Sequence, residues 1–417
     1  MNCGSSDLEQ FIDLGNQPNG NVFLSAEHLH QEQMFSCIML VCTQCWQVQI
    51  KDFPPVDTMF ANHPYISGLN QPVVAHFENL ARATVSKFSM PENSLVLDIG
   101  ANDGTLLKKF RDLGMRVLGI DPCQQVQTLS RKAGITVLQT FWNQQSGQSM
   151  QQLGIYPDLI TATAVFYHVE DIHSFIQGLK IVMKQHTVFC VQCVYLKDVI
   201  EKVQFDHFYH EHTMIHAIGP LKRVFSAHGL RLLDVDFYPI HGGSFVLYVG
   251  REDFPAPTSE KIATAINEEE KAGLYQLQTY RNFAMRVQQN KHALVSLLTE
   301  LKQSGQRVFG LGAPVKGNTL LNYYGVGTDL IGCLTEVNPE KTGRYAPGSH
   351  IPVISEHDVD KQPDYYLVLS WNFLDYLLQK YADYLDNGGH FIVPHPKVHV
   401  IGRNGAITPH NEVKQVL

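Results

Sequence analysis

The sequence predicts an α/β protein with a small cysteine-bearing N-terminal domain followed by two Rossmann-like domains. The chain has 417 residues, which is more than one compact core usually holds. Strand-like and helical segments alternate in two separate stretches, a pattern typical of parallel sheets covered by helices on both faces. Four of the eight cysteines lie in the first sixty residues. We therefore expect domains over residues 1–60, 61–255 and 256–417.

The composition narrows the possible functions. Hydrophobic residues make up 44% of the chain and charged residues 17%, as in globular proteins. The net charge is -8 and no Lys/Arg-rich run occurs, which argues against a nucleic-acid partner. No apolar run is long enough to span a membrane, and the N-terminus lacks the features of a secretory signal. We expect a cytoplasmic protein whose cysteines are thiols or metal ligands.

The central region begins with a strand–turn–helix–strand unit. An apolar strand over Leu95–Ile99 runs into a glycine-rich turn, and an amphipathic helix follows. A second strand over residues 117–120 ends at Asp121. Further strands are expected in "PDLITATAVFYHV" and "HTVFCVQCVYL". Cys190 and Cys193 lie in the latter and are expected in the core, because residues three apart on a strand point to opposite faces.

The turn "LDIGANDG" has the properties of a cofactor site. Gly100 and Gly104 allow the backbone to approach a ligand closely, with Asn102 between them, and a helix N-terminus offers unpaired N–H groups. Asp121 can accept hydrogen bonds from ribose hydroxyls. Carboxylates in the turn, including Asp98, would repel a pyrophosphate but suit a cationic sulfonium. The turn therefore indicates S-adenosylmethionine (SAM); the alternative is a tight turn without a ligand.

The C-terminal region begins with one long helical pattern from Ile262 to Leu301 that stops at "QSGQ". A new strand–turn–helix start, "RVFGLGAPVKGNTLLNYYG", predicts a second α/β domain. Lys316 follows its glycine-rich turn, where an ammonium and helix N–H groups can meet a diphosphate. The alternative is a surface lysine on a structural turn.

The first sixty residues contain a CxxC knuckle formed by Cys42 and Cys45, which in a cytosolic chain usually binds zinc. Cys3 is the nearest further ligand, but its own CxxC partner would precede Met1. The expected site is a structural Zn²⁺ held by Cys3, Cys42, Cys45 and a fourth ligand, either Cys37 or a cysteine upstream. The alternative is a knuckle that has lost its metal.

The stretch "FDHFYHEHTMIH" (residues 205–216) concentrates four histidines. A metal site, an acid/base site and a solvated loop are all compatible with it, but no His-Glu-x-x-His spacing occurs. His168 ends a predicted strand, where ligands bind in open α/β sheets. An imidazole titrates near neutral pH and a phenol can hydrogen-bond an oxyanion, so we favour acid/base chemistry. We expect His207 and His216 to be structural.

Several motifs in one order carry a family resemblance: "DIGANDGTLL", "FDHFYHEH", "HGGSFVLYV", "GLGAPVKGNTLLNY" and "GRYAPGSHIPV", after an N-terminal CxxC. Together they resemble the three-domain SAM-dependent nucleotide-sugar C-methyltransferases, which methylate carbon 3 of 4-keto deoxysugars. The resemblance covers nearly the whole chain. It implies an N-terminal zinc-binding domain, a central class I methyltransferase domain and a C-terminal Rossmann-like domain that helps hold the nucleotide, with Lys316 and Asn318 contacting the substrate.

The resemblance also implies catalytic roles. The family's Tyr-x-Glu-His corresponds to Tyr209, Glu211 and His212, its additional histidine to His168, and its N-terminal tyrosine to Tyr65 in "HPYISG". His212 would remove the proton at carbon 3, with Glu211 holding its orientation. Tyr209 and His168 would stabilise the enolate oxygen, without a metal.

The chain departs from the family pattern at two places. The family usually carries Asn near Thr163–Ala164 and an acidic residue near Gln192. Two other readings are a degenerate homologue that binds SAM or a nucleotide sugar without turnover, and a small-molecule O- or N-methyltransferase. The intact catalytic residues argue against a degenerate homologue. An O- or N-methyltransferase would need neither an enolate stabiliser nor a second α/β domain, so the presence of both in the sequence pattern argues against that reading.

Overall fold

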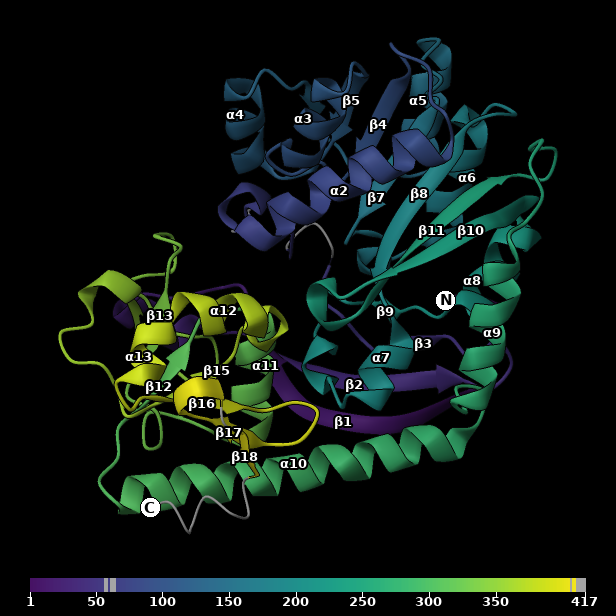
Figure 1. Ribbon diagram of the computed structural model, residues 1–417. Coiled ribbons are helices and arrows are strands. Elements are labelled where there is room, and N and C mark those ends of the chain that lie inside the picture. The colour runs from purple at the N-terminus through teal and green to yellow at the C-terminus, as the bar shows by residue number, and fades with distance from the viewer. Residues whose placement is uncertain (56–58, 61–64, 406, 410–417) are drawn as a thin grey trace.

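The computed structural model describes residues 1–55, 59–60, 65–405 and 407–409, which form three sheets joined by helices (Figure 1). The sheets follow one another in the order that the sequence predicts: an N-terminal sheet, a central Rossmann-like sheet and a second Rossmann-like sheet. Among the described residues, no helix combines the length and the apolar character that crossing a membrane would require.

The N-terminal sheet is antiparallel and has the order β1-β2-β3-β9. Its last strand comes from far along the chain, since Val48 of β3 pairs with Ile215 of β9. The sheet is therefore completed by a segment of the central region, near the end of the histidine-rich stretch. Its elements are β1 (Leu8–Pro18), η1 (Ala26–Gln31), β2 (Met34–Cys42), β3 (Val48–Ile50) and β9 (Met214–Ile215).

The central sheet has the order β10-β11-β8-β7-β4-β5-β6. Strands β4 to β8 are parallel, as expected, and Cys190 and Cys193 are fully buried in β8. The hairpin β10–β11 adds an antiparallel edge that the alternation of elements did not predict. The strands of the central sheet are β4 (Leu95–Ile99), β5 (Arg116–Ile120), β6 (Val137–Leu138), β7 (Leu159–Thr163), β8 (Val188–Val194), β10 (Leu230–Tyr238) and β11 (Ser244–Arg251). Its helices are η2 (Ser67–Leu69), α2 (Gln71–Lys87), α3 (Thr105–Asp112), α4 (Gln124–Lys132), α5 (Gln144–Gln152), η3 (Phe166–His168), α6 (Ile172–Val182), α7 (Leu196–Glu201), η4 (Phe205–His207), α8 (Ile218–Ala227) and η5 (Ile240–Gly242).

The C-terminal sheet has the order β14-β13-β12-β15-β16-β17-β18, with β12 to β16 parallel. Successive strands are added on one side of β12 and then on the other, so a ligand crevice is expected between β12 and β15. Its strands are β12 (Val308–Leu311), β13 (Leu334–Glu336), β14 (Val353–Ser355), β15 (Tyr365–Val368), β16 (His390–Val393), β17 (His399–Ile401) and β18 (Ile407–Pro409). Its helices are α11 (Val315–Tyr324), η6 (Glu356–Asp358), η7 (Trp371–Phe373), α12 (Leu374–Lys380), α13 (Ala382–Asp386) and η8 (Arg403–Gly405).

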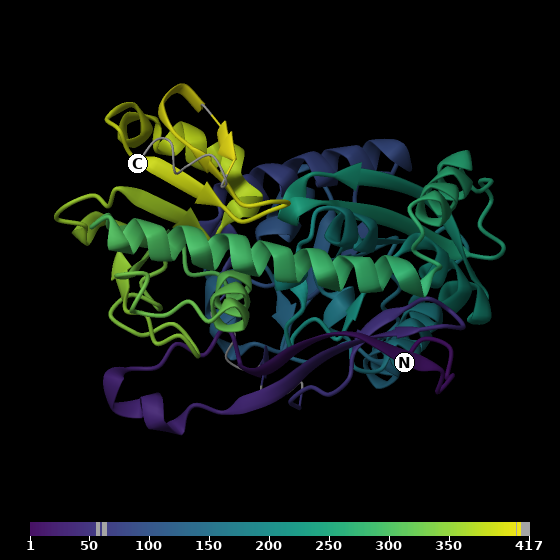
Figure 2. The ribbon, with the colours of Figure 1, turned by 90° about the horizontal axis from the view of Figure 1, so that it is seen from below.

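The single helical pattern expected from Ile262 to Leu301 is two helices, α9 (Glu260–Lys271) and α10 (Leu277–Gln303). The break occurs at Gly273, whose φ of 74° ends α9. Helix α10 then runs along the base of the molecule, in contact with β1, α7 and β12 (Figures 1 and 2). One helix therefore contacts elements of all three regions.

Buried Glu269 of α9 joins this helix to the central region. Its carboxylate accepts hydrogen bonds from the hydroxyls of Tyr195 (3.0 Å) and Tyr275 (2.6 Å). It also accepts the main-chain N–H groups of Ile218 (2.6 Å) and Gly219 (3.0 Å) at the start of α8. Burial raises the pKa of this carboxyl, and the four donors oppose the rise. One side chain therefore satisfies a helix N-terminus and two phenols.

Glu269→Ala should lower the free energy of unfolding by about 2–4 kcal/mol, because each buried donor left unsatisfied costs roughly 1–3 kcal/mol. Urea unfolding followed by circular dichroism measures the change. The matched control is Glu268→Ala, which removes an exposed neighbour paired with Lys271 and should change the value by less than about 0.5 kcal/mol. Equal midpoints for the two variants would contradict this role.

Candidate active site

A cleft of about 460 Å³ lies between the central and C-terminal sheets, within the size range of small-molecule sites. It brings together residues that are far apart in the sequence. From the central region its lining includes Tyr65, Ala164, His168, His207, Tyr209, Glu211, His212 and His241. From the C-terminal domain it includes Gly312, Lys316, Glu336, Lys341 and Asn372. All five residues expected to be catalytic thus line one cleft, with Lys316 among its other lining residues.

His212 is held in one tautomer. Its Nδ1 lies 2.7 Å from the carbonyl oxygen of His207, which can only accept, so Nδ1 carries the proton. The hydroxyl of Tyr209 then donates to Nε2 at 2.6 Å. Burial lowers the pKa of His212 well below its ordinary value, and nearby His168 and His207 lower it further. His212 is therefore a neutral imidazole with its lone pair on Nε2.

Tyr209 and His168 flank this imidazole. Burial and the nearby Glu211 raise the pKa of Tyr209 well above its ordinary value, so its hydroxyl keeps its proton. The Nδ1–H of His168, at the end of η3, donates to the carbonyl oxygen of Glu211 at 2.6 Å. The ring centroids of His168 and His212 are 5.1 Å apart. The two histidines and the phenol can therefore act on one small group.

The orientation of His212 differs from expectation. Glu211 was expected to hold the imidazole, but its buried carboxylate accepts a hydrogen bond from the side chain of Asn21 at 2.7 Å. The His207 carbonyl and Tyr209 orient His212 instead. Glu211 thus connects the catalytic stretch to the N-terminal region, a contact across 190 positions that no local pattern in the sequence could indicate.

The glycine-rich turn after β4 requires its glycines for a left-handed backbone and for close packing. Gly100 has φ of 73°, and a Cβ there would lie 2.3 Å from Val165. Gly104, with φ of 81°, is the N-cap of α3. Asp98 is almost fully buried and accepts from Thr161 at 2.6 Å. Burial raises the pKa of the Asp98 carboxyl to about 7, and Asp121 adds to the rise.

Asp121 lies directly after β5, as expected, and its carboxylate accepts the N–H groups of Asn102 and Cys123, both at 2.9 Å. The side chain of Asn102 donates to the carbonyl oxygen of Tyr65 at 3.0 Å and accepts the N–H of Ser67 at 2.9 Å. The turn is thus linked to the segment that carries Tyr65, whose side chain is 40% exposed beside the cleft.

Lys316 is a cleft residue, not a surface lysine. It is 8% exposed, donates to Asn372 Oδ1 at 2.8 Å and lies 4.5 Å above the ring of Trp371. Burial lowers the pKa of Lys316 to about 8, against the attraction of Asp206. Asn318 differs from expectation: its fully buried side chain donates to the carbonyl oxygen of Gly20 at 2.8 Å, away from the cleft lining.

Sequence reasoning missed several lining residues. Lys341 donates to the carbonyl oxygen of Ala313 at 2.9 Å and lies 4.0 Å from Glu336. Burial lowers the pKa of Lys341, while Glu336 and Glu211 oppose the fall. The position of Glu336 at the end of β13 was the available signal, because it matches that of Asp121 after β5.

The two departures from the family pattern lie near the site. Ala164 has a left-handed φ of 59°, a conformation that suits Asn better than Ala. Gln192 lies with Oε1 2.6 Å from Nε2 of His76. Burial lowers the pKa of His76, and the amide opposes this only in part. A carboxylate in place of Gln192 would favour the charged imidazole, whereas the amide of Gln192 leaves a neutral pair.

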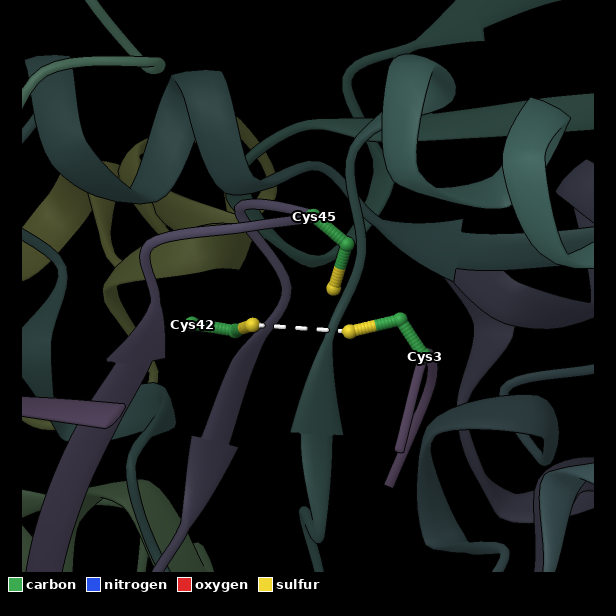
Figure 3. Close-up of side chains that lie close together, drawn as sticks. All are labelled: Cys3, Cys42 and Cys45. Carbon is green, nitrogen blue, oxygen red and sulfur yellow. Dashed lines mark hydrogen bonds between the residues drawn. The ribbon is translucent and has the colours of Figure 1, made fainter. Parts of the chain in front are cut away.

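Three cysteines of the N-terminal region form the metal cluster. The sulfurs of Cys3, Cys42 and Cys45 lie within 4.8 Å of one another, and those of Cys3 and Cys42 are 3.6 Å apart (Figure 3). Tetrahedral zinc with Zn–S bonds of about 2.3 Å separates its sulfurs by about 3.8 Å, so the three thiols fit. Cys37 was wrongly considered as the fourth ligand, since its buried sulfur faces the carbonyl oxygen of Phe208 at 3.5 Å.

Freshly purified protein should contain about one zinc per chain, and Cys42→Ser or Cys45→Ser should lose it because the thiolates supply most of the binding energy. Mass spectrometry of the metal content measures both. Cys333→Ser, which alters a buried cysteine outside the cluster, is the control and should keep the metal. A zinc-free wild-type preparation would contradict the prediction.

Three protein-family models match the chain in succession. They describe a zinc-binding domain (residues 2–60), a methyltransferase domain (residues 74–235) and a C-methyltransferase C-terminal domain (residues 239–396). C-methyltransferase NovU of Streptomyces niveus is 29% identical over 407 residues, which cover 97% of each chain.

Two solved structures resemble part of the chain. Magnesium protoporphyrin IX methyltransferase of Synechocystis PCC 6803 with bound SAH is 14% identical, with a TM-score of 0.34 over 43% of this chain and 83% of that one. The PH0226 protein of Pyrococcus horikoshii OT3 is 12% identical, with a TM-score of 0.36 over 48% of this chain and 100% of that one. The succession of the three family models and the full-length similarity to NovU agree with the motifs and indicate a SAM-dependent C-methyltransferase with the three expected domains.

Proposed function

We propose that this C-methyltransferase adds a methyl group to carbon 3 of a nucleotide-linked 4-keto deoxysugar through an enolate. The observation that carries the proposal is the neutral His212 imidazole, whose Nε2 accepts from Tyr209 at 2.6 Å inside a cleft that also contains a buried ammonium. A proton next to a ketone is acidic enough for an imidazole base only if the developing oxyanion is stabilised.

In this proposal, Tyr209 changes partners when substrate binds. Without substrate its hydroxyl donates to Nε2 of His212. A ketone oxygen beside Tyr209 would draw the hydroxyl toward itself, and Nε2 would then accept the proton from carbon 3. His168 lies on the same side with its Nδ1–H fixed by the Glu211 carbonyl, so it would donate from Nε2 to the oxyanion only as an imidazolium.

The methyl donor would bind at the turn after β4. Gly100 and Gly104 would shape this turn through their left-handed backbone, and Asp121 would accept from the ribose hydroxyls of the donor. Bound SAM supplies an electrophilic methyl group. Asn102 connects this turn to the Tyr65 segment, which would close over the sugar. Asp98, whose carboxyl is buried against Thr161, would support the turn near the methionine end.

The C-terminal wall would bind the nucleotide. Lys316 and Lys341 are both held in the lining by neighbouring oxygen acceptors, and both would contact the diphosphate. Burial lowers the pKa values of both ammonium groups, because it disfavours their charged form. A bound dianion would favour the charged form and raise both pKa values again. This arrangement favours an anionic substrate over a neutral small molecule.

His212→Ala should slow removal of the carbon 3 proton by about 10²–10⁴-fold, the usual contribution of a general base. With S-adenosylhomocysteine in place of SAM, the wild type should wash solvent deuterium into carbon 3 of a 4-keto nucleotide sugar, read by mass spectrometry. With SAM, the same sugar should gain one methyl group.

His216→Gln is the matched control, because this buried histidine contacts Gln47 and the Phe166 carbonyl outside the cleft lining. It should exchange at nearly the wild-type rate. Exchange by His212→Ala at the wild-type rate would place the base elsewhere. Binding without methyl gain would favour a degenerate homologue, and methyl gain without exchange would favour O- or N-methylation.

Lys316→Ala should raise the KM for the nucleotide sugar about 10–100-fold with little effect on SAM affinity, because a hydrogen bond to a charged group contributes about 1.5–3 kcal/mol. Steady-state kinetics with each substrate varied in turn measures the difference. The control is Lys397→Ala, at an exposed lysine outside the cleft. An unaltered sugar KM would show that Lys316 does not contact the diphosphate.

A further inference from the structure

The dipeptide Asp206–His207 joins the catalytic stretch to the C-terminal domain. Both residues are buried, at 0% and 1% exposed. Oδ2 of Asp206 accepts the indole N–H of Trp371 at 2.7 Å, and Oδ1 lies 3.1 Å from Nε2 of His395. Trp371 and His395 both belong to the C-terminal domain, 165 or more positions away in the sequence. Asp206 thus meets two partners that only the docked domain supplies.

The second residue of the dipeptide leads to the base. The ring of His207 donates from Nε2 to the carbonyl oxygen of His241 at 3.1 Å. Its own carbonyl oxygen accepts the Nδ1–H of His212 at 2.7 Å. One residue therefore lies between the Asp206 contacts and the hydrogen bond that sets the tautomer of His212.

The charge of Asp206 makes this connection rigid. Burial alone would raise the pKa of its carboxyl, but His395, His207 and Lys316 hold it at about 2, so it is ionised. A buried charge is stable only while its partners stay in place, and losing one partner leaves an uncompensated ion. The position of the dipeptide therefore depends on Trp371 and His395.

The loop at His241 is held by the same tryptophan. His241 has the left-handed φ of 58°, which is unfavourable for a residue other than glycine. A Cβ on the following Gly242 would lie 2.6 Å from the ring of Trp371. Trp371 thus contacts two groups that hold His207 in place. One is the carboxylate of Asp206, and the other is the loop whose His241 carbonyl accepts the hydrogen bond from the His207 ring.

We propose that Asp206, His207, Trp371 and His395 are positioning residues that couple docking of the C-terminal domain to the orientation of His212. Trp371, His395 and Asp206 lie outside the described lining of the cleft, so they act through His207 and not on the substrate. The sequence expectation that His207 is merely structural is revised accordingly. The proposal rests on His212 as the base, and its test has one measurement that needs no sugar.

That measurement is nitrogen NMR of the full-length, ¹⁵N-histidine-labelled protein with S-adenosylhomocysteine bound. The chain has 20 histidines, so the His212 signals are assigned by their loss in His212→Gln. The wild type should show His212 with its proton on Nδ1. Trp371→Phe, which keeps a ring against Lys316 but removes the donor to Asp206, should give a mixture of the two tautomers.

Kinetics supplies the second measurement. Trp371→Phe and His395→Ala should lower kcat by about 10–100-fold, part of the contribution of a positioned base, while KM and S-adenosylhomocysteine affinity stay within about two-fold. His395→Gln keeps a donor toward Asp206 and should recover most of kcat. The matched control is His350→Gln, which alters another histidine–carboxylate contact between domains, to Glu32 at 2.9 Å, and should leave both measurements unchanged.

The outcomes separate the two proposals. An Nδ1–H tautomer of His212 that persists in Trp371→Phe and His395→Ala overturns the coupling, whatever the activity. A rise in KM with unchanged kcat also overturns it, because that result assigns these residues to substrate binding. If no 4-keto sugar is methylated by the wild type, the proposed function fails, while a tautomer change in the variants still supports the coupling.

Discussion

A main-chain carbonyl oxygen can only accept a hydrogen bond, and that constraint determines the chemistry of the cleft. Because the His207 carbonyl faces Nδ1 of His212, the basic lone pair must lie on Nε2, toward Tyr209. The Glu211 carbonyl imposes the same tautomer on His168. Two backbone groups thus define which ring nitrogen of each histidine can meet a substrate. The side chains around them supply burial, which keeps His212 neutral.

The two Rossmann-like domains share one hydrogen-bonding arrangement at the carboxyl ends of their parallel strands. In the central domain, the carboxylate of Asp121 accepts the N–H of Asn102 from the turn after the first strand. In the C-terminal domain, Glu336 at the end of β13 accepts the N–H of Ala313 from the turn after β12 at 3.1 Å. In each case a carboxylate at the end of a neighbouring strand shapes the turn that a ligand would approach. Ala164, directly after β7, and Glu336, at the end of β13, both line the cleft, so each domain presents carboxyl ends of its strands to it.

The sequence predicted those parts of the site that depend on local structure. A strand, a glycine turn and a helix correctly placed Gly100 and Asp121 after neighbouring strands, and a CxxC spacing indicated Cys42 and Cys45 of the three clustered cysteines. His168 was expected at the end of a strand, but β7 ends at Thr163 and His168 lies in η3. The sequence did not predict the contacts that join distant segments, such as Glu211 with Asn21, Asn318 with Gly20 or Asp206 with His395. Such contacts follow from how finished domains pack, and no spacing or periodicity records them. For this reason the sequence did not predict that Asn318 contacts Gly20, or that the Glu211 carboxylate contacts Asn21 and not His212.

The pairing of β3 with β9 has a consequence for synthesis. Translation makes the zinc cluster and three strands of the N-terminal sheet first, and the partner of β3 is Met214–Ile215. At about 5–20 residues per second, roughly ten to thirty seconds pass before that partner is made. During this interval the edge of β3 presents unpaired backbone groups, which promote association with other strands. The nascent chain must therefore be protected there until the histidine-rich stretch has left the ribosome.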